Sequence, residues 1–195
     1  MNILFCGQAE SGKDEASNHL YKFADSTKWK RKAFASEVKR IFCENFNVDI
    51  EFVEKWKRIK QAPPGFDMPI RDCLIMIGDG WRKINKDIWV NRCLNNEKLN
   101  LIISDGRYIS ESLKIRENGI SILLWCPNKE NNIDSPSEKE LLPFVRELEN
   151  YPSGRINFDH IPFDFWIKND STLNHLRDKI ENLIVPYLRD KNESN

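Results

Sequence analysis

Glycine and lysine residues follow the first apolar run of the chain at the spacing Gly7-x-x-x-x-Gly12-Lys13. A glycine-rich turn between a strand and a helix directs several backbone N–H groups into one concavity, and the positive end of the helix adds to its attraction for phosphate. Lys13 would then reach the outer phosphates of a nucleotide, so the motif predicts a phosphate-binding loop. The residues expected to bind these phosphates are Gly7, Ala9, Glu10, Ser11, Gly12, Lys13, Asp14 and Glu15.

Asp14 stands where this motif ordinarily has a serine or threonine whose hydroxyl ligates Mg²⁺. A carboxylate can take that role, directly or through water, because Mg²⁺ prefers hard oxygen ligands. Its negative charge beside the phosphates must then be offset by the metal and by Lys13. Glu15 adds a second carboxylate in the first helical turn, where a metal role and a favourable interaction with the helix N-terminus both stay open.

A second pair of charged residues, Asp105 and Arg107, follows the apolar run that begins at Leu99. Open α/β sheets bind their ligands at the carboxyl ends of the strands. Asp105 is therefore expected to ligate a metal or a metal-bound water, with capping of the sheet end as the alternative. The fork of Arg107 suits a phosphate group, with a surface ion pair as the alternative.

The glycine-rich loop follows an expected strand, the pair Asp105 and Arg107 lies at the end of another, and an expected helix comes after each. The same alternation of strands and helices continues along the chain. Apolar runs predict buried strands at 2–6, 99–107, 120–127 and 164–170. The spacing of apolar residues predicts helices that begin after the glycine turn and over 37–46, 49–60, 70–81, 87–96, 110–118 and 171–188. This alternation predicts an α/β protein with a parallel sheet and helices on both of its faces.

Three local features carry their own expectations. The basic run Lys28–Lys32 is interpreted as a solvated surface turn, with a patch for polyanions as the alternative. Ser36 is expected to cap the N-terminus of a helix, since its hydroxyl can accept from a free amide of the first turn. Gly119 is expected to end the helix that precedes it.

The composition excludes several classes of protein. Thirty basic and thirty acidic residues give a formal net charge of zero, so we expect no nucleic acid and no membrane as partner. Five dispersed cysteines suit reduced thiols rather than disulfides, and there is no CxxC pair or HExxH motif for zinc. The chain opens without a signal peptide and has no stretch of about 20 apolar residues, so a cytoplasmic protein is expected.

With these features, the chain resembles the phage-type deoxynucleoside monophosphate kinases, a branch of the P-loop kinases. That family's loop ends in Gly-Lys-Asp, as Gly12-Lys13-Asp14 does here. The segment 70–94 is similar to its Arg, Leu, Gly, Trp-Val segment. The segment 101–112 is similar to its strand followed by Asp-x-Arg and, four residues after the arginine, a glutamate. The segment 163–176 is similar to its closing strand, Asn-Asp turn and helix.

The resemblance implies a three-layer P-loop kinase fold in a single domain, 1–195, with an acceptor-binding helical insertion at about 45–95 and a small lid at about 128–160. It implies phosphoryl transfer from ATP, with Mg²⁺, to a (deoxy)nucleoside 5′-monophosphate, in the cytoplasm of the host cell if the chain is viral. Lys13, Asp105 and Arg107 would be catalytic, and Asp14 and Asp105 would hold the metal. The residues expected to bind the acceptor are Arg71, Trp81, Arg82, Arg107 and Glu111.

Two positions depart from the family's pattern. The residue after Lys-Asp is ordinarily threonine or serine in the family, and here it is Glu15. The lid pattern Asp-x-His-x-Ser-Glu is met only in part, because Ser135 stands at the position of the histidine. Arg146 and Arg155 lie in the expected lid, and Asn169 lies where the family has its adenine end, although a turn is the plainer interpretation for an Asn-Asp pair.

The sequence leaves other functions open. The same fold and donor could serve another acceptor, such as a modified base in DNA, a coenzyme precursor or another small phosphate. A nucleotide-binding module without phosphoryl transfer is a further alternative, although such a module has no use for Asp105, Arg107 and Glu111. The accepted base and sugar stay open, and so does the formation of a homodimer.

Overall fold

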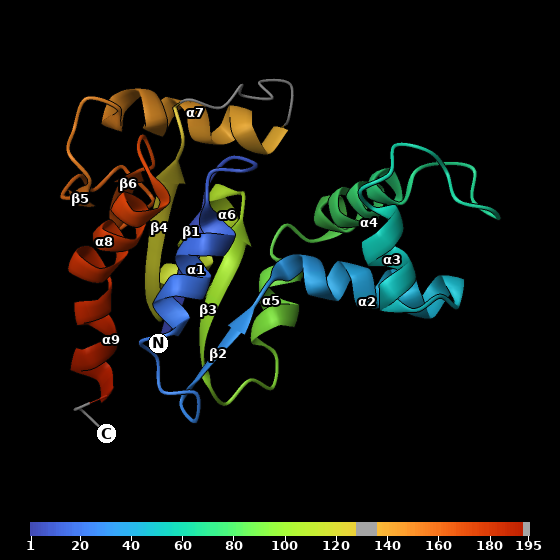
Figure 1. Ribbon diagram of the computed structural model, residues 1–195, viewed down its shortest axis with the longest axis horizontal. Coiled ribbons are helices and arrows are strands. Elements are labelled where there is room, and N and C mark those ends of the chain that lie inside the picture. The colour runs from blue at the N-terminus through green and yellow to red at the C-terminus, as the bar shows by residue number, and fades with distance from the viewer. Residues whose placement is uncertain (128–135, 193–195) are drawn as a thin grey trace. The chain divides into compact units, whose positions relative to one another are not determined.

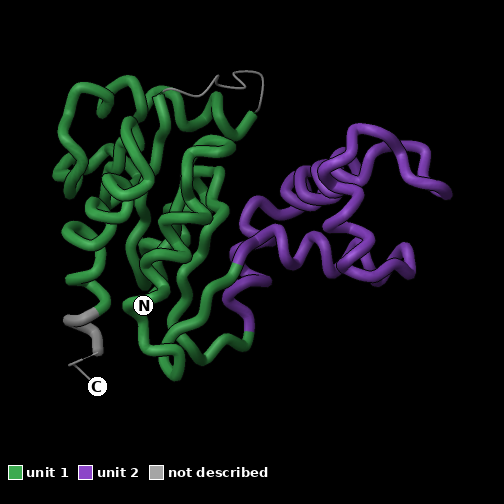
Figure 2. Tube along the Cα trace, viewed as in Figure 1, with its two compact units in different colours: residues 1–32, 96–195 green, residues 33–95 purple. Residues whose placement is uncertain are grey.

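The computed structural model describes residues 1–127 and 136–192, with side chains described as far as residue 188. The chain divides into two compact units (Figure 2). Unit 1 comprises residues 1–32 and 96–195, and unit 2 comprises residues 33–95. The helical insertion predicted over about 45–95 lies within unit 2, which begins earlier in the chain.

Unit 1 is built around a six-stranded sheet with the order β2-β3-β1-β4-β6-β5 (Figure 1). All neighbouring strands run parallel except β5 and β6, which are antiparallel. The sheet confirms the predicted α/β class and adds an antiparallel edge that the sequence did not indicate. The strands are β1 (Asn2–Cys6), β2 (Trp29–Lys32), β3 (Asn100–Gly106), β4 (Gly119–Trp125), β5 (Gly154–Arg155) and β6 (Phe165–Lys168).

Helices cover both faces of this sheet, as predicted. On one face, α1 (Lys13–Tyr21) and α8 (Leu173–Leu183) bury a cluster that includes Ile3 and Phe5 of the central strand. Helix α6 (Ile109–Arg116) packs on β1 and β4. The crossover through α6 runs across the sheet in the direction opposite to the one through α1, and right-handed crossovers then place the two helices on opposite faces.

Strand β2 corrects the interpretation of Lys28–Lys32 as a surface turn. Its residues Trp29–Lys32 pair in parallel with β3, and the Trp29 side chain is completely buried in the core of unit 1. Strand β2 lies at the edge of the sheet, where charged side chains can reach water. Because of these charged residues it has no apolar run, and hydropathy did not indicate a strand. Lys32 pairs with Glu97 at 2.6 Å, so its partly buried charge is neutralised.

Two predicted helix boundaries are also wrong. Helix α2 (Phe34–Phe46) begins after Ala33, whose backbone is extended, so Ser36 lies inside the first turn and does not cap it. Gly119 is the first residue of β4 rather than the end of α6. A Cβ atom at Gly119 would lie 2.0 Å from the carbonyl oxygen of Asn2, so glycine is required there by the close approach of β4 to β1.

Unit 2 consists of α2 together with α3 (Ile50–Trp56), α4 (Ile70–Ile84) and α5 (Ile88–Leu94). Pro69 directly precedes α4, where a proline does not interrupt the hydrogen bonds of the helix. Phe42, Val53, Ile70 and Cys73 form the buried core of these helices.

The rest of unit 1 includes α7 (Pro136–Leu148), which lies across the end of the sheet where β1 and β4 finish (Figure 1). The segment predicted as a lid thus contains α7 and β5, whereas its residues 128–135, including Ser135, lie outside the described residues. The predicted closing helix is divided at Ile184 into α8 and α9 (Val185–Asn192). Among the described residues, no helix has the length and apolar character that crossing a membrane requires.

Candidate active site

The glycine turn that follows β1 is shaped by two close contacts. A Cβ atom at Gly7 would lie 2.0 Å from the carbonyl oxygen of Leu124 in β4, so any larger residue would push the loop away from the sheet. Gly12 directly precedes α1, and a Cβ atom there would lie 2.8 Å from Nδ2 of Asn169. Its φ of 101° is a left-handed conformation that glycine adopts without strain. These contacts explain why the motif requires glycine at both positions.

The start of α1 offers unpaired backbone donors. In the described part of the chain, the amides of Gly12, Lys13 and Asp14 donate no hydrogen bond, and no side chain caps the helix. The first amides of a helix carry partial positive charge and attract anions. The predicted loop therefore presents a set of open donors, as a phosphate site requires.

Lys13 is folded back onto the loop that would hold the phosphates. Its ammonium donates to the carbonyl oxygen of Gly7 at 2.9 Å and to that of Gln8, and the side chain is buried. The pKa of Lys13 is lowered to about 8, mainly because the ammonium is removed from water and next because the positive charge of Arg107 is nearby. The negative charges of Asp105 and Asp14 act in the opposite direction.

Arg107 directly follows the carboxyl end of β3, and β3 is the strand that lies beside β1. Among the described residues its guanidinium forms neither an ion pair nor a hydrogen bond, which argues against the alternative of a surface ion pair. A half-buried arginine without a partner, next to a second cation, has the chemistry of an anion site. Asp105, two residues earlier, is half-buried, and its charge also acts on Lys13.

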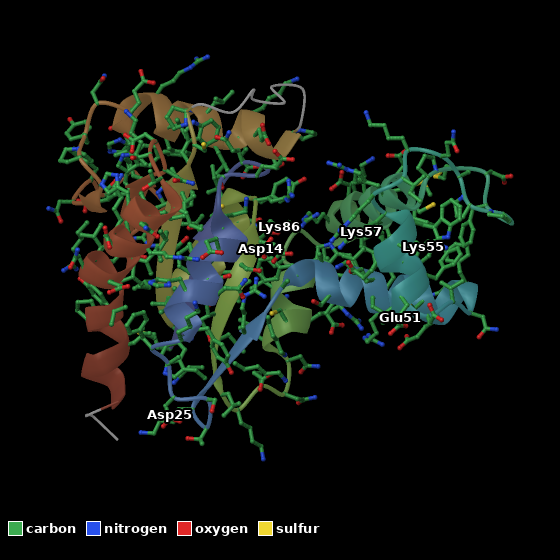
Figure 3. The ribbon with its side chains drawn as sticks, in the orientation of Figure 1. Asp14, Asp25, Glu51, Lys55, Lys57 and Lys86 are labelled. Atoms are coloured by element: carbon green, nitrogen blue, oxygen red, sulfur yellow. The ribbon has the colours of Figure 1, made fainter. Side chains whose placement is uncertain are left out.

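Asp14 lies at the start of α1 (Figure 3). Its carboxylate pairs with Arg31 of β2 at 2.7 Å. The same arginine donates from Nε to the hydroxyl of Ser17, 2.9 Å away. The Asp14 side chain is 82% exposed, so this ion pair is held weakly and the carboxylate is accessible to a ligand. Arg31 was not singled out by the sequence, because it lies in the run interpreted as a turn.

Glu15 has an arginine partner as well, and it comes from the far end of the chain. Arg177 of α8 donates to Glu15 Oε1 from Nε at 2.9 Å and from Nη2 at 2.6 Å. This contact between α1 and α8 gives Glu15 a structural role in addition to its position at the helix start. A metal role for Glu15 is untested.

Two other segments, α7 and the residues after β6, hold further residues of the loop. Ala9 donates its amide to Glu138 Oε1 of α7 at 3.0 Å. Asn169, after β6, donates from Nδ2 to the carbonyl oxygen of Ser11 at 2.9 Å. Glu10 is exposed, with a left-handed backbone at φ 57°. Asn169 thus has a contact with the phosphate loop that the sequence did not predict.

Glu111 is buried and caps helix α6. Its Oε2 accepts from the amide of Arg107 at 2.8 Å and from that of Tyr108 at 3.1 Å. The carboxylate thereby fixes the backbone that carries Arg107. The acceptor contact that the resemblance implies for Glu111 stays a prediction.

The other residues predicted to bind the acceptor lie in unit 2, on α4. Trp81 stacks on Trp89 with ring centroids 5.5 Å apart, and Arg92 lies 5.9 Å from the centre of the Trp81 ring. Arg82 pairs with Asp79 at 3.3 Å, whereas Arg71 is exposed and forms no ion pair with any described residue. Their roles toward an acceptor stay predictions.

The two carboxylates predicted to hold Mg²⁺ offer only oxygen ligands, which suit this ion. Asp14 at the start of α1 and Asp105 at the end of β3 both lie close enough to Lys13 for their charges to raise its pKa. Within 1–127 and 136–192, no three His, Cys, Asp or Glu side chains gather as a metal-binding group. The residues therefore fit an ion that arrives largely coordinated by phosphate and water, as Mg²⁺ does with nucleotides.

No protein-family model and no curated protein matches this chain. Shikimate kinase from Acinetobacter baumannii, in complex with shikimate, is similar at 14% identity over 97% of this chain and 94% of that one, with a TM-score of 0.49. Dephospho-CoA kinase from Campylobacter jejuni is similar at 12% identity over 98% and 100% of the two chains, with a TM-score of 0.48.

Shikimate kinase from Aquifex aeolicus is similar at 13% identity over 93% of this chain and 95% of that one, with a TM-score of 0.48. Likenesses at these identities and TM-scores do not establish what this chain binds or converts. The resemblance to the phage-type deoxynucleoside monophosphate kinases therefore stays a prediction, and the chemistry of the site has to carry any assignment of function.

Proposed function

We propose that the chain transfers a phosphoryl group from ATP to a (deoxy)nucleoside 5′-monophosphate, giving the diphosphate. One observation carries this proposal: the unpaired guanidinium of Arg107 lies close enough to the buried Lys13 to lower its pKa, beside a loop with open amides. Two neighbouring cations repel each other, so their pairing is unfavourable until an anion with several charges lies between them. The terminal phosphate of ATP and the phosphate of the acceptor together supply such a charge.

The residues divide between the two substrates by position. Lys13 and the amides of Gly12 and Asp14 would hold the outer phosphates of ATP. Arg107 would hold the phosphate of the acceptor or the group in transfer, and Glu111 would keep its backbone in place. An acceptor phosphate is already ionised at neutral pH, so the reaction needs charge neutralisation and alignment more than a base.

Mg²⁺ is part of this proposal, with Asp14 and Asp105 as the residues that would hold it. When bound, the ion would neutralise part of the phosphate charge during transfer. Asp14 would exchange its exposed ion pair with Arg31 for a contact with the metal or its water shell. The released Arg31 would then be available to phosphate oxygens.

On the acceptor side, the proposal assigns Arg71, Trp81 and Arg82 of α4 to the nucleoside monophosphate. Of these three residues, Arg71 is the one whose charge is most available to the acceptor phosphate, because it is exposed and no described residue neutralises it. Trp81 stacks on the buried Trp89 and is itself half-buried, and its ring is of the kind that contacts bases.

Release of ADP, measured by a coupled assay across the deoxynucleoside and ribonucleoside monophosphates, tests the proposal. Turnover of at least one monophosphate in the presence of Mg²⁺ is expected. If ATP binds and no monophosphate is turned over, the assigned acceptor is wrong.

The variant Arg107→Ala separates a kinase from a nucleotide-binding module. We expect kcat to fall about 100-fold or more with the affinity for ATP nearly unchanged, because the arginine acts on the group in transfer. Arg116→Ala is the matched control from the same segment, since Arg116 already pairs with Asp164 at 3.1 Å. Equal activity of the two variants would refute the role of Arg107.

A further inference from the structure

The first turn of α7 places a buried carboxylate on the phosphate loop. Glu138 is only 3% exposed, and its Oε1 accepts the amide hydrogen of Ala9 at 3.0 Å. Its second oxygen, Oε2, is buried and has no donor in the described part of the chain. Because the two oxygens share one carbon atom, this unpaired acceptor also lies beside the loop.

Folding alone does not account for this arrangement. A carboxylate in the first turn of a helix is favourable, which explains an acidic residue near the start of α7. It does not explain why the carboxylate is buried with one neutral donor, because an unsatisfied charged oxygen is expensive to remove from water. A glutamine would accept from Ala9 equally well without the charge. The neighbouring Glu140 accepts from the amide of Ile109 at 2.7 Å and leaves no buried oxygen unpaired.

We propose that Glu138 is a nucleotide-binding residue whose Oε2 accepts a hydrogen bond from an O–H group of the bound nucleotide complex. This inference rests on the proposed function and names a further contact of the same site. The O–H group belongs either to a water on the nucleotide's Mg²⁺ or to a hydroxyl of the nucleoside. In both cases the ligand supplies a donor to a buried acceptor that has none among the described residues of the protein. The new hydrogen bond removes the cost of the unpaired acceptor and so strengthens binding.

The variant Glu138→Gln tests this proposal because it has nearly the same shape. The amide of Ala9 requires an acceptor, so the glutamine oxygen takes the place of Oε1 and its NH₂ group takes the place of Oε2. The NH₂ group of the glutamine would then face the O–H group of the nucleotide complex, and two donors cannot form a hydrogen bond with each other. We expect the dissociation constant for ATP, measured by titration calorimetry, to rise about 10- to 100-fold. The urea midpoint of the empty protein should stay equal or rise, because a buried charge has been removed.

Two further variants make the result specific. Glu138→Asp keeps the carboxylate on a shorter side chain and should bind ATP more tightly than Glu138→Gln. Glu140→Gln is the matched control and should bind ATP as the wild type does. Titrations with Mg²⁺ and with EDTA identify the donor: a loss seen only with Mg²⁺ assigns it to a metal-bound water, and an equal loss in both assigns it to the nucleoside.

The proposal would be overturned if Glu138→Gln bound ATP as tightly as the wild type. It would also be overturned if the loss of affinity came with an equal loss of stability, since the carboxylate would then serve the fold. A wild-type protein that binds no ATP would overturn the proposed function together with this inference. Wild-type binding with an unaffected Glu138→Gln variant would overturn this inference alone.

Discussion

Raising the pH from 7 to 9 should weaken nucleotide binding through one group, the ammonium of Lys13. In the empty protein its pKa is lowered to about 8, because it is buried and lies near Arg107. Phosphate oxygens bound between these cations would return the pKa toward its ordinary value of 10.5. Binding then requires a protonated Lys13. Each protein molecule whose Lys13 is neutral before binding must therefore take up a proton when the nucleotide binds.

The size of the effect follows from that pKa. At pH 8 about half of the empty protein carries a neutral Lys13, and at pH 9 about nine tenths does. The affinity for ATP should therefore fall about tenfold between pH 7 and pH 9. The second ionisation of a phosphate group lies near pH 6 and is complete across this range, so the nucleotide adds little to the slope.

Titration calorimetry in buffers with different heats of ionisation measures the protons taken up on binding. We expect about 0.5 proton at pH 8 and about 0.9 at pH 9. In Lys13→Arg the side chain stays charged at every pH used, so both the uptake and the slope should vanish even if binding is weaker. A wild-type protein that takes up no proton, or an equal slope in Lys13→Arg, would refute the account of Lys13.

The stability of the empty protein should respond in the opposite direction. The folded protein lowers the pKa of Lys13, so between about pH 8 and pH 10.5 the unfolded chain binds more protons than the folded one. Stability therefore rises with pH across this window, by about 3 kcal/mol at most from this group. The difference in urea unfolding between wild type and Lys13→Met, followed from pH 7 to pH 10, isolates this contribution.

Two further substitutions test the framework around the site. Gly7→Ala should abolish ATP binding and lower stability by about 2 kcal/mol or more, because its Cβ atom would lie 2.0 Å from the carbonyl oxygen of Leu124. Gly80→Ala is its control, since a Cβ atom there meets no atom within 4 Å, and calorimetric unfolding should show it unchanged or more stable. Trp89→Phe should destabilise unit 2 by about 1–3 kcal/mol in thermal unfolding, because it removes the 2.9 Å hydrogen bond from Nε1 to the carbonyl oxygen of Gly78 and weakens the stack on Trp81. An unchanged melting temperature of Trp89→Phe would mean that this contact does not stabilise the helices.

Much of unit 1 could be predicted from short stretches of sequence. The apolar run Asn2–Cys6 forms the central strand as expected, and the glycine spacing after it produces a loop with open amides. Such features depend on neighbours within a few residues, through periodicity and local backbone geometry. Where a strand carries charge, as Trp29–Lys32 does, the same signal fails, because an edge strand buries only part of its surface.

The partners of the loop could not be predicted in this way. Asp14 meets Arg31, Glu15 meets Arg177, and the amide of Ala9 meets Glu138. The last two pairs join residues 162 and 129 positions apart in the chain. No periodicity extends over such separations.

The sequence by itself determined the class of the fold, the place of the glycine-rich loop and the positions of Lys13, Asp105 and Arg107 beside apolar runs. Only the tertiary structure decided which side chains gather on that loop. The strand order β2-β3-β1-β4-β6-β5 brings β3 and β4 to either side of β1, and α7 and α8 return to it from the end of the chain. The physical reason is that strand pairing and burial act between distant segments, whereas the sequence displays only what each segment prefers locally.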